Sequence, residues 1–291
     1  MCSRRQSGCF AIVYSGQERD FFSGTGWQRS MVAIHLAPNS QEQLNEELFQ
    51  REQEELLAKM AKGPPPDEPW PEGCYGSRLA WLTFVGPSPG GHNINPQPGP
   101  RGQGVMPLWN GEYLDPCENW SKGFRISTQI FVETILNRSR EHGALKLYNF
   151  ANFDWVPNPN ASNVPEERMR QGSNEVINHL NSVKPRVILT MERRAHKLLT
   201  DIVSKQYTIC RPPFGNIQLL SVITRNGPKY HRQIDAYAIR GRGPLDGRFV
   251  LRCPQHPARI FNRDYADRVA HALRHVFVCM AIREKPISIN E

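Results

Sequence analysis

The sequence contains no long apolar run. Its longest apolar stretches reach only about seven or eight residues before a charge or a proline intervenes, whereas a helix that spans a bilayer needs about 20. The basic start, residues 1–5, is not followed by the apolar segment of a secretory signal, because polar and charged side chains arrive from Ser15 onward. We therefore expect a soluble, cytoplasmic protein with no membrane partner.

Paired cysteines are lacking as well. The seven cysteines are scattered from Cys2 to Cys279, without a CxxC pair and without a group of Cys and His at ligand spacing. Scattered cysteines are typical of a reducing compartment, and neither a zinc site nor an iron–sulfur site is visible. The sequence thus predicts no metal and no cofactor.

Acidic residues are concentrated in one segment. Residues 41–73 hold nine acidic side chains against three basic ones, a local charge of −6, while the whole chain carries +8. The remainder therefore carries +14. Such a basic body suits a polyanion such as DNA, because each cation that neutralises a phosphate releases counterions. Simple solubility explains the same excess equally well.

The chain divides into four parts by composition. Residues 1–38 show no clear period and are expected to form a disordered tail. Residues 39–77 combine an acidic amphipathic helix over 41–62 with a proline-rich linker, and nothing in the sequence identifies a protein partner for that helix. Residues 78–285 form the predicted α/β domain, and residues 286–291 are a short C-terminal tail. We expect a monomer.

Within 78–285, short apolar runs alternate with helical patterns. Continuously apolar strands are buried on both faces, as in a central, mostly parallel sheet between helices. The fold class is therefore predicted to be α/β, a three-layer αβα sandwich. Strands are expected at 79–85, 145–150, 187–190, 218–223 and 249–253, and helices at 127–141, 166–183, 192–205 and 264–282.

Three segments that border these strands carry short motifs. Residues 84–90 read Phe-Val-Gly-Pro-Ser-Pro-Gly, residues 184–190 read Lys-Pro-Arg-Val-Ile-Leu-Thr, and residues 253–259 read Cys-Pro-Gln-His-Pro-Ala-Arg. In their order and spacing these segments resemble the motifs of the uracil-DNA glycosylase superfamily, over roughly residues 78–280. The pattern is nearest to the iron–sulfur branch, but the cysteines of its cluster are absent.

The resemblance implies catalytic roles for Ser88 and His256. Ser88 stands where the family carries the Asp or Asn that positions the attacking water, and a serine hydroxyl is a very poor base. His256 matches the histidine that hydrogen-bonds the carbonyl of the leaving base. A displaced carboxylate is expected at Asp154, with Glu112 and Asp115 as alternatives, although each of these acids is more readily explained as a solvated loop residue or a turn cap.

The resemblance also implies a base-binding pocket. Gly86 and Pro87 form its rigid turn, and Asn149 is expected to read the base edge at the end of a strand, with Asn152 as a competitor in the neighbouring register. Trp109 is a candidate for stacking on the base, worth about 1–3 kcal/mol, or for a place in the core.

DNA contacts are expected from basic loops. Arg259 and Ile260 follow the His256 motif on the loop that enters the minor groove in relatives. Arg101 and Arg232 belong to a wider set of cations that suits a phosphate-tracking surface. No lysine occupies a matched active-site position.

Together these features predict a monofunctional DNA glycosylase that flips out and excises uracil or a modified pyrimidine, leaving an abasic site. The six prolines and seven glycines between Gly86 and Gly111 favour a bulkier base, such as a hydroxymethylated or glucosylated cytosine. Removal of such a base suits DNA repair or bacterial defence against phage. Ser88 favours an alternative, an inactive module of this fold that binds DNA, abasic sites or nucleotides.

Overall fold

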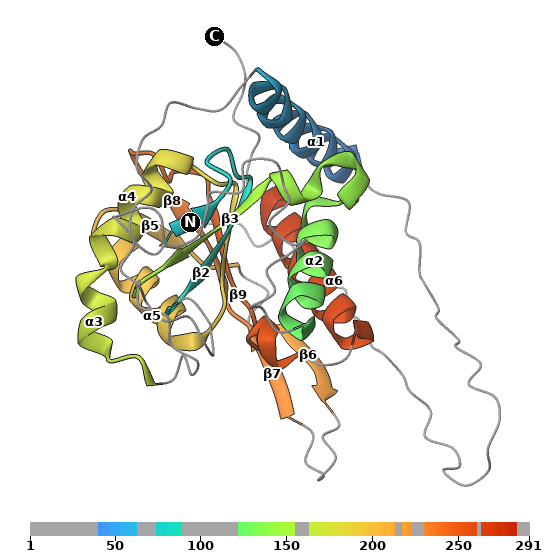
Figure 1. Cartoon of the computed structure of the whole chain (residues 1–291). Helices are drawn as coiled ribbons and strands as arrows, with labels where there is room; N and C mark the ends of the chain where they lie inside the picture. Colours follow the sequence, from blue (N-terminus) through green and yellow to red (C-terminus); the bar gives the residue numbers. More distant parts are fainter. Residues whose placement is uncertain are drawn as a thin grey trace, which may run out of the picture.

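The protein has an α/β fold built on one seven-stranded sheet (Figure 1). The computed structural model describes residues 40–62, 74–88, 122–154, 163–212, 217–222, 230–260 and 263–283. Along the sheet the strands are β1 (Cys74–Gly76), β3 (Tyr148–Asn152), β2 (Leu82–Gly86), β4 (Val187–Thr190), β9 (Phe249–Arg252), β8 (Ala236–Arg240) and β5 (Thr208–Cys210). The central strands β3, β2, β4 and β9 run parallel, and the pairings outside them are antiparallel.

Helices cover both faces of the sheet, as the predicted three-layer sandwich requires. One face carries α1 (Ser40–Ala61), α2 (Lys122–Leu136) and α6 (Arg263–Arg283), and the other carries α3 (Glu166–Gln171), α4 (Ser173–Val183) and α5 (Arg193–Val203) (Figure 1). Among the described helices, none combines the length and the apolarity that a membrane span needs.

The central strands are apolar throughout because both of their faces are buried. Along β2, Leu82 and Phe84 pack toward α2 and α6, while Val85 packs toward α4 and α5. Leu189 and Ile188 of β4 divide between the two layers in the same way. Each strand therefore contributes to two cores through the alternation of its side chains.

The predicted strands over 79–85, 145–150, 187–190 and 249–253 correspond to β2, β3, β4 and β9, with boundaries shifted by up to three residues. The strand predicted at 218–223 is present as β6 (Ile217–Val222), but it lies outside the main sheet. It pairs with β7 (Tyr230–Ile234) in a separate antiparallel hairpin.

The helix predicted over 166–183 is divided in two at Gly172. A Cβ atom at this position would lie 1.8 Å from the carbonyl oxygen of Phe153, the residue that follows β3. Only glycine permits so close an approach of two backbones. The break between α3 and α4 thus fixes these helices against the carboxyl end of β3.

Helix α1 packs on the body of the protein, although its sequence lies outside the predicted domain. Phe49 is 3% exposed, and its ring lies 5.7 Å from that of Trp81 and 4.8 Å from that of Phe277. Met60 is buried in the same cluster. The apolar side of this acidic helix is therefore part of the main core.

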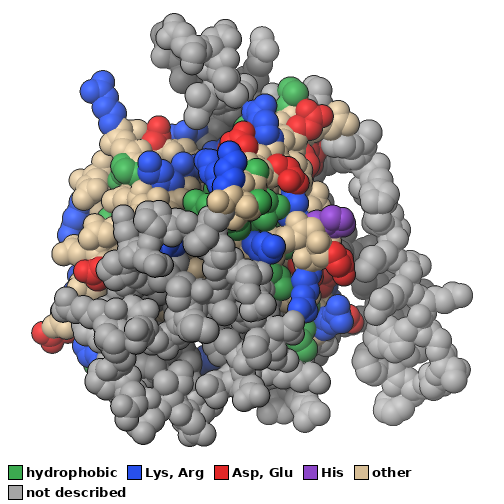
Figure 2. All heavy atoms as spheres, turned by 45° about the horizontal axis from the view of Figure 1, so that its top comes forward, with side chains coloured by type: hydrophobic (Ala, Val, Ile, Leu, Met, Phe, Trp, Pro, Cys, Tyr) green, Lys and Arg blue, Asp and Glu red, His purple; other side chains and the backbone are tan. Residues whose placement is uncertain are grey.

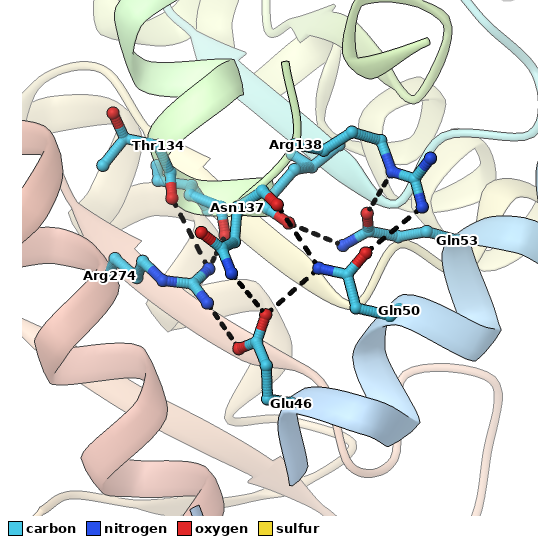
Figure 3. Close-up of polar contacts among 9 residues, drawn as sticks. Glu46, Gln50, Gln53, Thr134, Asn137, Arg138 and Arg274 are labelled. Carbon is cyan, nitrogen blue, oxygen red and sulfur yellow. Dashed lines mark hydrogen bonds and ion pairs between the residues drawn. The ribbon is translucent and has the colours of Figure 1, made fainter. Parts of the chain in front are cut away.

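Polar side chains of α1 and α6 also cap the end of α2 (Figure 3). Gln53 donates from Nε2 to the carbonyl oxygen of Leu136 at 3.0 Å, and Arg274 donates from Nη1 to that of Ile135 at 2.7 Å. Glu46 pairs with Arg274. The last carbonyls of a helix have no partner within the helix, so these contacts satisfy them and fix α1 in place.

Candidate functional site

Several polar side chains lie at one edge of the sheet, where the parallel strands β3, β2, β4 and β9 end. Ligands of such sheets bind beyond the carboxyl ends of the strands. The segments that leave this edge are residues 86–88, 152–154, 191–192 and 253–256. The predicted site residues Gly86, Pro87, Ser88, Asn152, Asp154 and His256 all belong to these segments.

The segments that follow β2 and β3 are held together by backbone hydrogen bonds. The N–H group of Phe153 donates to the oxygen of Gly86 at 3.1 Å, and that of Asp154 donates to the oxygen of Pro87 at 2.8 Å. Ser88 is 6% exposed. Within the described part of the chain, its hydroxyl oxygen has no hydrogen-bond partner.

Asp154 is engaged in an ion pair. Its Oδ1 accepts a hydrogen bond from Nη2 of Arg168 at 2.7 Å, and its side chain is 2% exposed. Arg168 belongs to α3, so the pair fixes this helix to the end of β3. In this conformation the Asp154 carboxylate is therefore engaged in holding α3 against the sheet.

The two candidate asparagines have different environments. Asn149 is the second residue of β3 and is 0% exposed. Its Oδ1 accepts a hydrogen bond from Thr83 at 2.6 Å, and its Nδ2 donates to the oxygen of Ser77 at 2.8 Å and lies 3.1 Å from Nε2 of His179. These contacts are internal to the fold, and Asn149 lies within β3 and not at its end, so its base-reading role stays a prediction.

Asn152 occupies the strand end that was expected for Asn149. It is the last residue of β3 and lies opposite Gly86 of β2. A Cβ atom at Gly86 would lie 2.6 Å from Oδ1 of Asn152 and 2.5 Å from the terminal methyl group of Met191. Glycine at this position therefore leaves room for the amide of Asn152 beside the turn that holds Ser88.

His256 follows β9 and is partly buried. Its ring stacks on that of Phe124 of α2, with the centroids 5.9 Å apart. Burial, with a smaller effect from the cation of Arg259, lowers the pKa of His256 from 6.5 to about 4. The imidazole is therefore neutral at pH 7 and offers one N–H donor.

The two predicted DNA-contacting residues after His256 differ in their exposure to solvent. Arg259 is exposed at the end of the short 3-10 helix η5 (Pro257–Arg259). Ile260 is 2% exposed and packs in the core, where its carbonyl oxygen accepts a hydrogen bond from Ser127 at 3.1 Å. In this conformation only Arg259 presents its side chain to the surface.

Other predicted residues lie outside the described part of the chain. These are Trp109, Arg101, Glu112 and Asp115, together with the side chain of Arg232 on β7. On the face drawn in Figure 2, the described Lys and Arg side chains lie among Asp and Glu side chains.

Sequence reasoning missed two acidic groups at this edge. Glu192 comes two residues after β4, and burial raises its pKa against the opposing effects of Arg194 and Arg259. Asp235 precedes β8 and lies 3.3 Å from Nε2 of His196, whose Nδ1 lies 2.9 Å from the hydroxyl of Thr190. The place of Glu192 directly after a predicted strand was a signal that could have identified it.

Two neutral histidines predict how stability depends on pH. Burial, with a smaller effect from Arg78, lowers the pKa of His179 to about 3, and the pKa of His256 is about 4. Between about pH 4 and 6.5, the unfolded chain binds protons at these residues that the folded chain does not. We expect the melting temperature to fall as pH is lowered through this range.

Differential scanning fluorimetry from pH 4 to 7 measures this effect. Carboxylates also titrate in the lower half of the range, so the informative quantity is the slope between pH 5 and 6.5. We expect this slope to be smaller in His256→Gln than in the unaltered protein. Equal slopes in the two proteins would contradict the assignment of His256 as a neutral, partly buried group.

Within the described residues, no three or more His, Cys, Asp or Glu side chains are grouped in a way that could hold a metal ion.

No model of a known protein family matches the chain, and no curated protein sequence matches it significantly.

Proposed function

We propose that this protein is a monofunctional DNA glycosylase, a divergent member of the uracil-DNA glycosylase superfamily. It would hydrolyse the N-glycosidic bond of uracil or of a modified pyrimidine and leave an abasic site. The observation that carries the proposal is that residues of separate motifs lie at the same edge of the sheet, where its parallel strands end. Ser88 and His256 follow β2 and β9, and Asn152 ends β3; these strands belong to one parallel group, in which β4 lies between β2 and β9.

The chemistry of bond cleavage suits these groups. The bond breaks through a sugar with oxocarbenium character, which needs a water held beneath C1′ and a donor that stabilises the charge on the departing base. The buried hydroxyl of Ser88 can orient the water. The neutral imidazole of His256 can donate its N–H to a carbonyl oxygen of the base.

Asn152 supplies the group that would recognise the base. Its amide carries a donor and an acceptor, which complement the edge of a pyrimidine. The residue is 1% exposed and lies at the end of its strand beside the Gly86 turn. A base that enters this place has left the duplex, and flipping a modified or unpaired base costs less than flipping a paired one.

The second candidate function is a binding module without catalysis. Ser88 favours it, because a hydroxyl is a very poor base, and so does the ion pair that neutralises Asp154. Such a module would bind DNA, abasic sites or nucleotides through the same strand-end loops. It would use Asn152 and Arg259 but would break no bond.

Incubation with defined oligonucleotides separates the two functions. Single-stranded and duplex DNA carrying uracil, hydroxymethylcytosine or its glucosylated form is treated with the protein and then with alkali, which cleaves at abasic sites. A glycosylase gives strand breaks at the modified position and none in the unmodified cytosine control. Binding without strand breaks on all substrates would refute the enzymatic proposal and support the module.

A further inference from the structure

Glu192 occupies the centre of the strand-end edge. It follows β4, which lies between β2 and β9 in the sheet. On one side the N–H group of Met191 donates to the oxygen of Val85 at 2.9 Å, and on the other that of Cys253 donates to the oxygen of Thr190 at 2.8 Å. These bonds fix the segment that carries Glu192 between the Ser88 turn and the His256 segment.

Within the described part of the chain, the Glu192 side chain neither caps α5 nor pairs its buried oxygen. Glu192 stands at the N-cap position of α5, but its side chain makes no capping hydrogen bond. Its Oε1 is buried, and among the described residues it has no hydrogen-bond partner. A buried carboxylate oxygen without a partner is costly, so this arrangement calls for a role beyond structure.

Two opposing effects act on the pKa of Glu192. Arg194 on α5 and Arg259 on η5 favour its ionised form, while burial opposes ionisation and has the larger effect. His256, on the segment that leads into η5, is neutral at pH 7. The result is a partly desolvated carboxylate whose pKa is raised, so that it holds a proton more readily than a solvated glutamate.

We infer that Glu192 is the general base of the reaction, which acts on a water oriented by the Ser88 hydroxyl. This inference rests on the proposed glycosylase function. The C1′–N bond breaks and its electron pair leaves with the base, while the water oxygen forms a bond to C1′. The water gives its proton to Glu192, and the departing base later takes a proton from solvent. Glu192 thereby fills the role for which Ser88 is chemically unsuited.

Glu192→Gln tests the inference, because it keeps the shape of the side chain and removes its charge. A positioned general base contributes about 10²–10⁴-fold to rate, so we expect kcat to fall by about that factor with KM little changed. Glu192→Asp keeps the charge on a shorter side chain and should retain part of the activity. Glu175→Gln, an exposed acid on α4, is the matched control and should behave as the unaltered protein.

The pH profile of kcat distinguishes a base from a residue that only supports the structure. In the unaltered protein, activity should be lost on acidification with a midpoint above 4.5, the ordinary pKa of a glutamate. In Glu192→Gln this limb should disappear and leave only the limb of His256 near pH 4.

The outcomes separate the inference from the function on which it rests. If the unaltered protein releases a base and Glu192→Gln stays within threefold of it with the same acid limb, the inference is overturned and the glycosylase proposal stands. If the unaltered protein releases no base from any substrate, both fail. Should Glu192→Gln not fold, full activity of Glu192→Asp with an unshifted acid limb would overturn the inference.

Discussion

Replacement of His256 by alanine is expected to slow base release by about 10²–10³-fold, the usual effect of removing one donor that stabilises developing negative charge. The neutral imidazole is positioned by its stack on Phe124, and its lowered pKa keeps it neutral over the physiological range. The neutral imidazole can donate its N–H to the carbonyl oxygen on which negative charge develops. Single-turnover kinetics measure the chemical step directly.

The control for this variant is His271→Ala on α6, whose side chain is 67% exposed. It should leave the rate unchanged. The melting temperature of each variant shows whether a loss of rate follows from a loss of folded protein. If folded His256→Ala releases the base at the same rate as the control variant, His256 has no catalytic role.

Phe49→Ala is expected to lower the free energy of unfolding by about 3–5 kcal/mol, as for other large aromatic side chains deleted from a core. The ring packs against those of Trp81 and Phe277, which also contact each other, and the guanidinium of Arg186 lies above it at 5.5 Å. Loss of the ring opens a cavity between α1 and the body. Denaturation in urea, followed by circular dichroism, measures the change.

Leu44→Ala is the matched control, because Leu44 lies on the same helix and is 58% exposed. It should change stability by no more than about 0.5 kcal/mol. Similar small changes in both variants would show that α1 is not packed in solution as it is in this structure. The acidic helix would then be a separate element, as its composition alone indicates.

Much of the central sheet could be predicted from the sequence, because strands buried on both faces are continuously apolar. The run that became β4 was bounded correctly for this reason. β8 was missed, since Ala236–Arg240 is a short run with a tyrosine and an arginine, and its antiparallel pairing with β9 depends on a contact formed only in the folded protein. The separation of β6 from the sheet has the same origin.

The sequence predicted which strand ends form the candidate site, but not which residue stands at each strand end. A strand end could be located only to within a few residues, and this uncertainty left Asn149 and Asn152 as competitors, of which Asn152 is the last residue of β3. The packing of α1 could not be inferred either, because an amphipathic pattern predicts an apolar face but not the surface that this face covers. The place of Glu192 directly after a strand is visible in the sequence, but its burial and the absence of a capping hydrogen bond depend on the fold.

The central claim is that the protein breaks an N-glycosidic bond in DNA, and mass spectrometry of the reaction mixture tests it most directly. Modified DNA is incubated with purified protein, and free base and intact strand are quantified before any alkaline treatment. We predict one free pyrimidine base for each abasic site formed, with the sugar-phosphate backbone unbroken. Folded protein that binds the same DNA and releases no free base would contradict the claim.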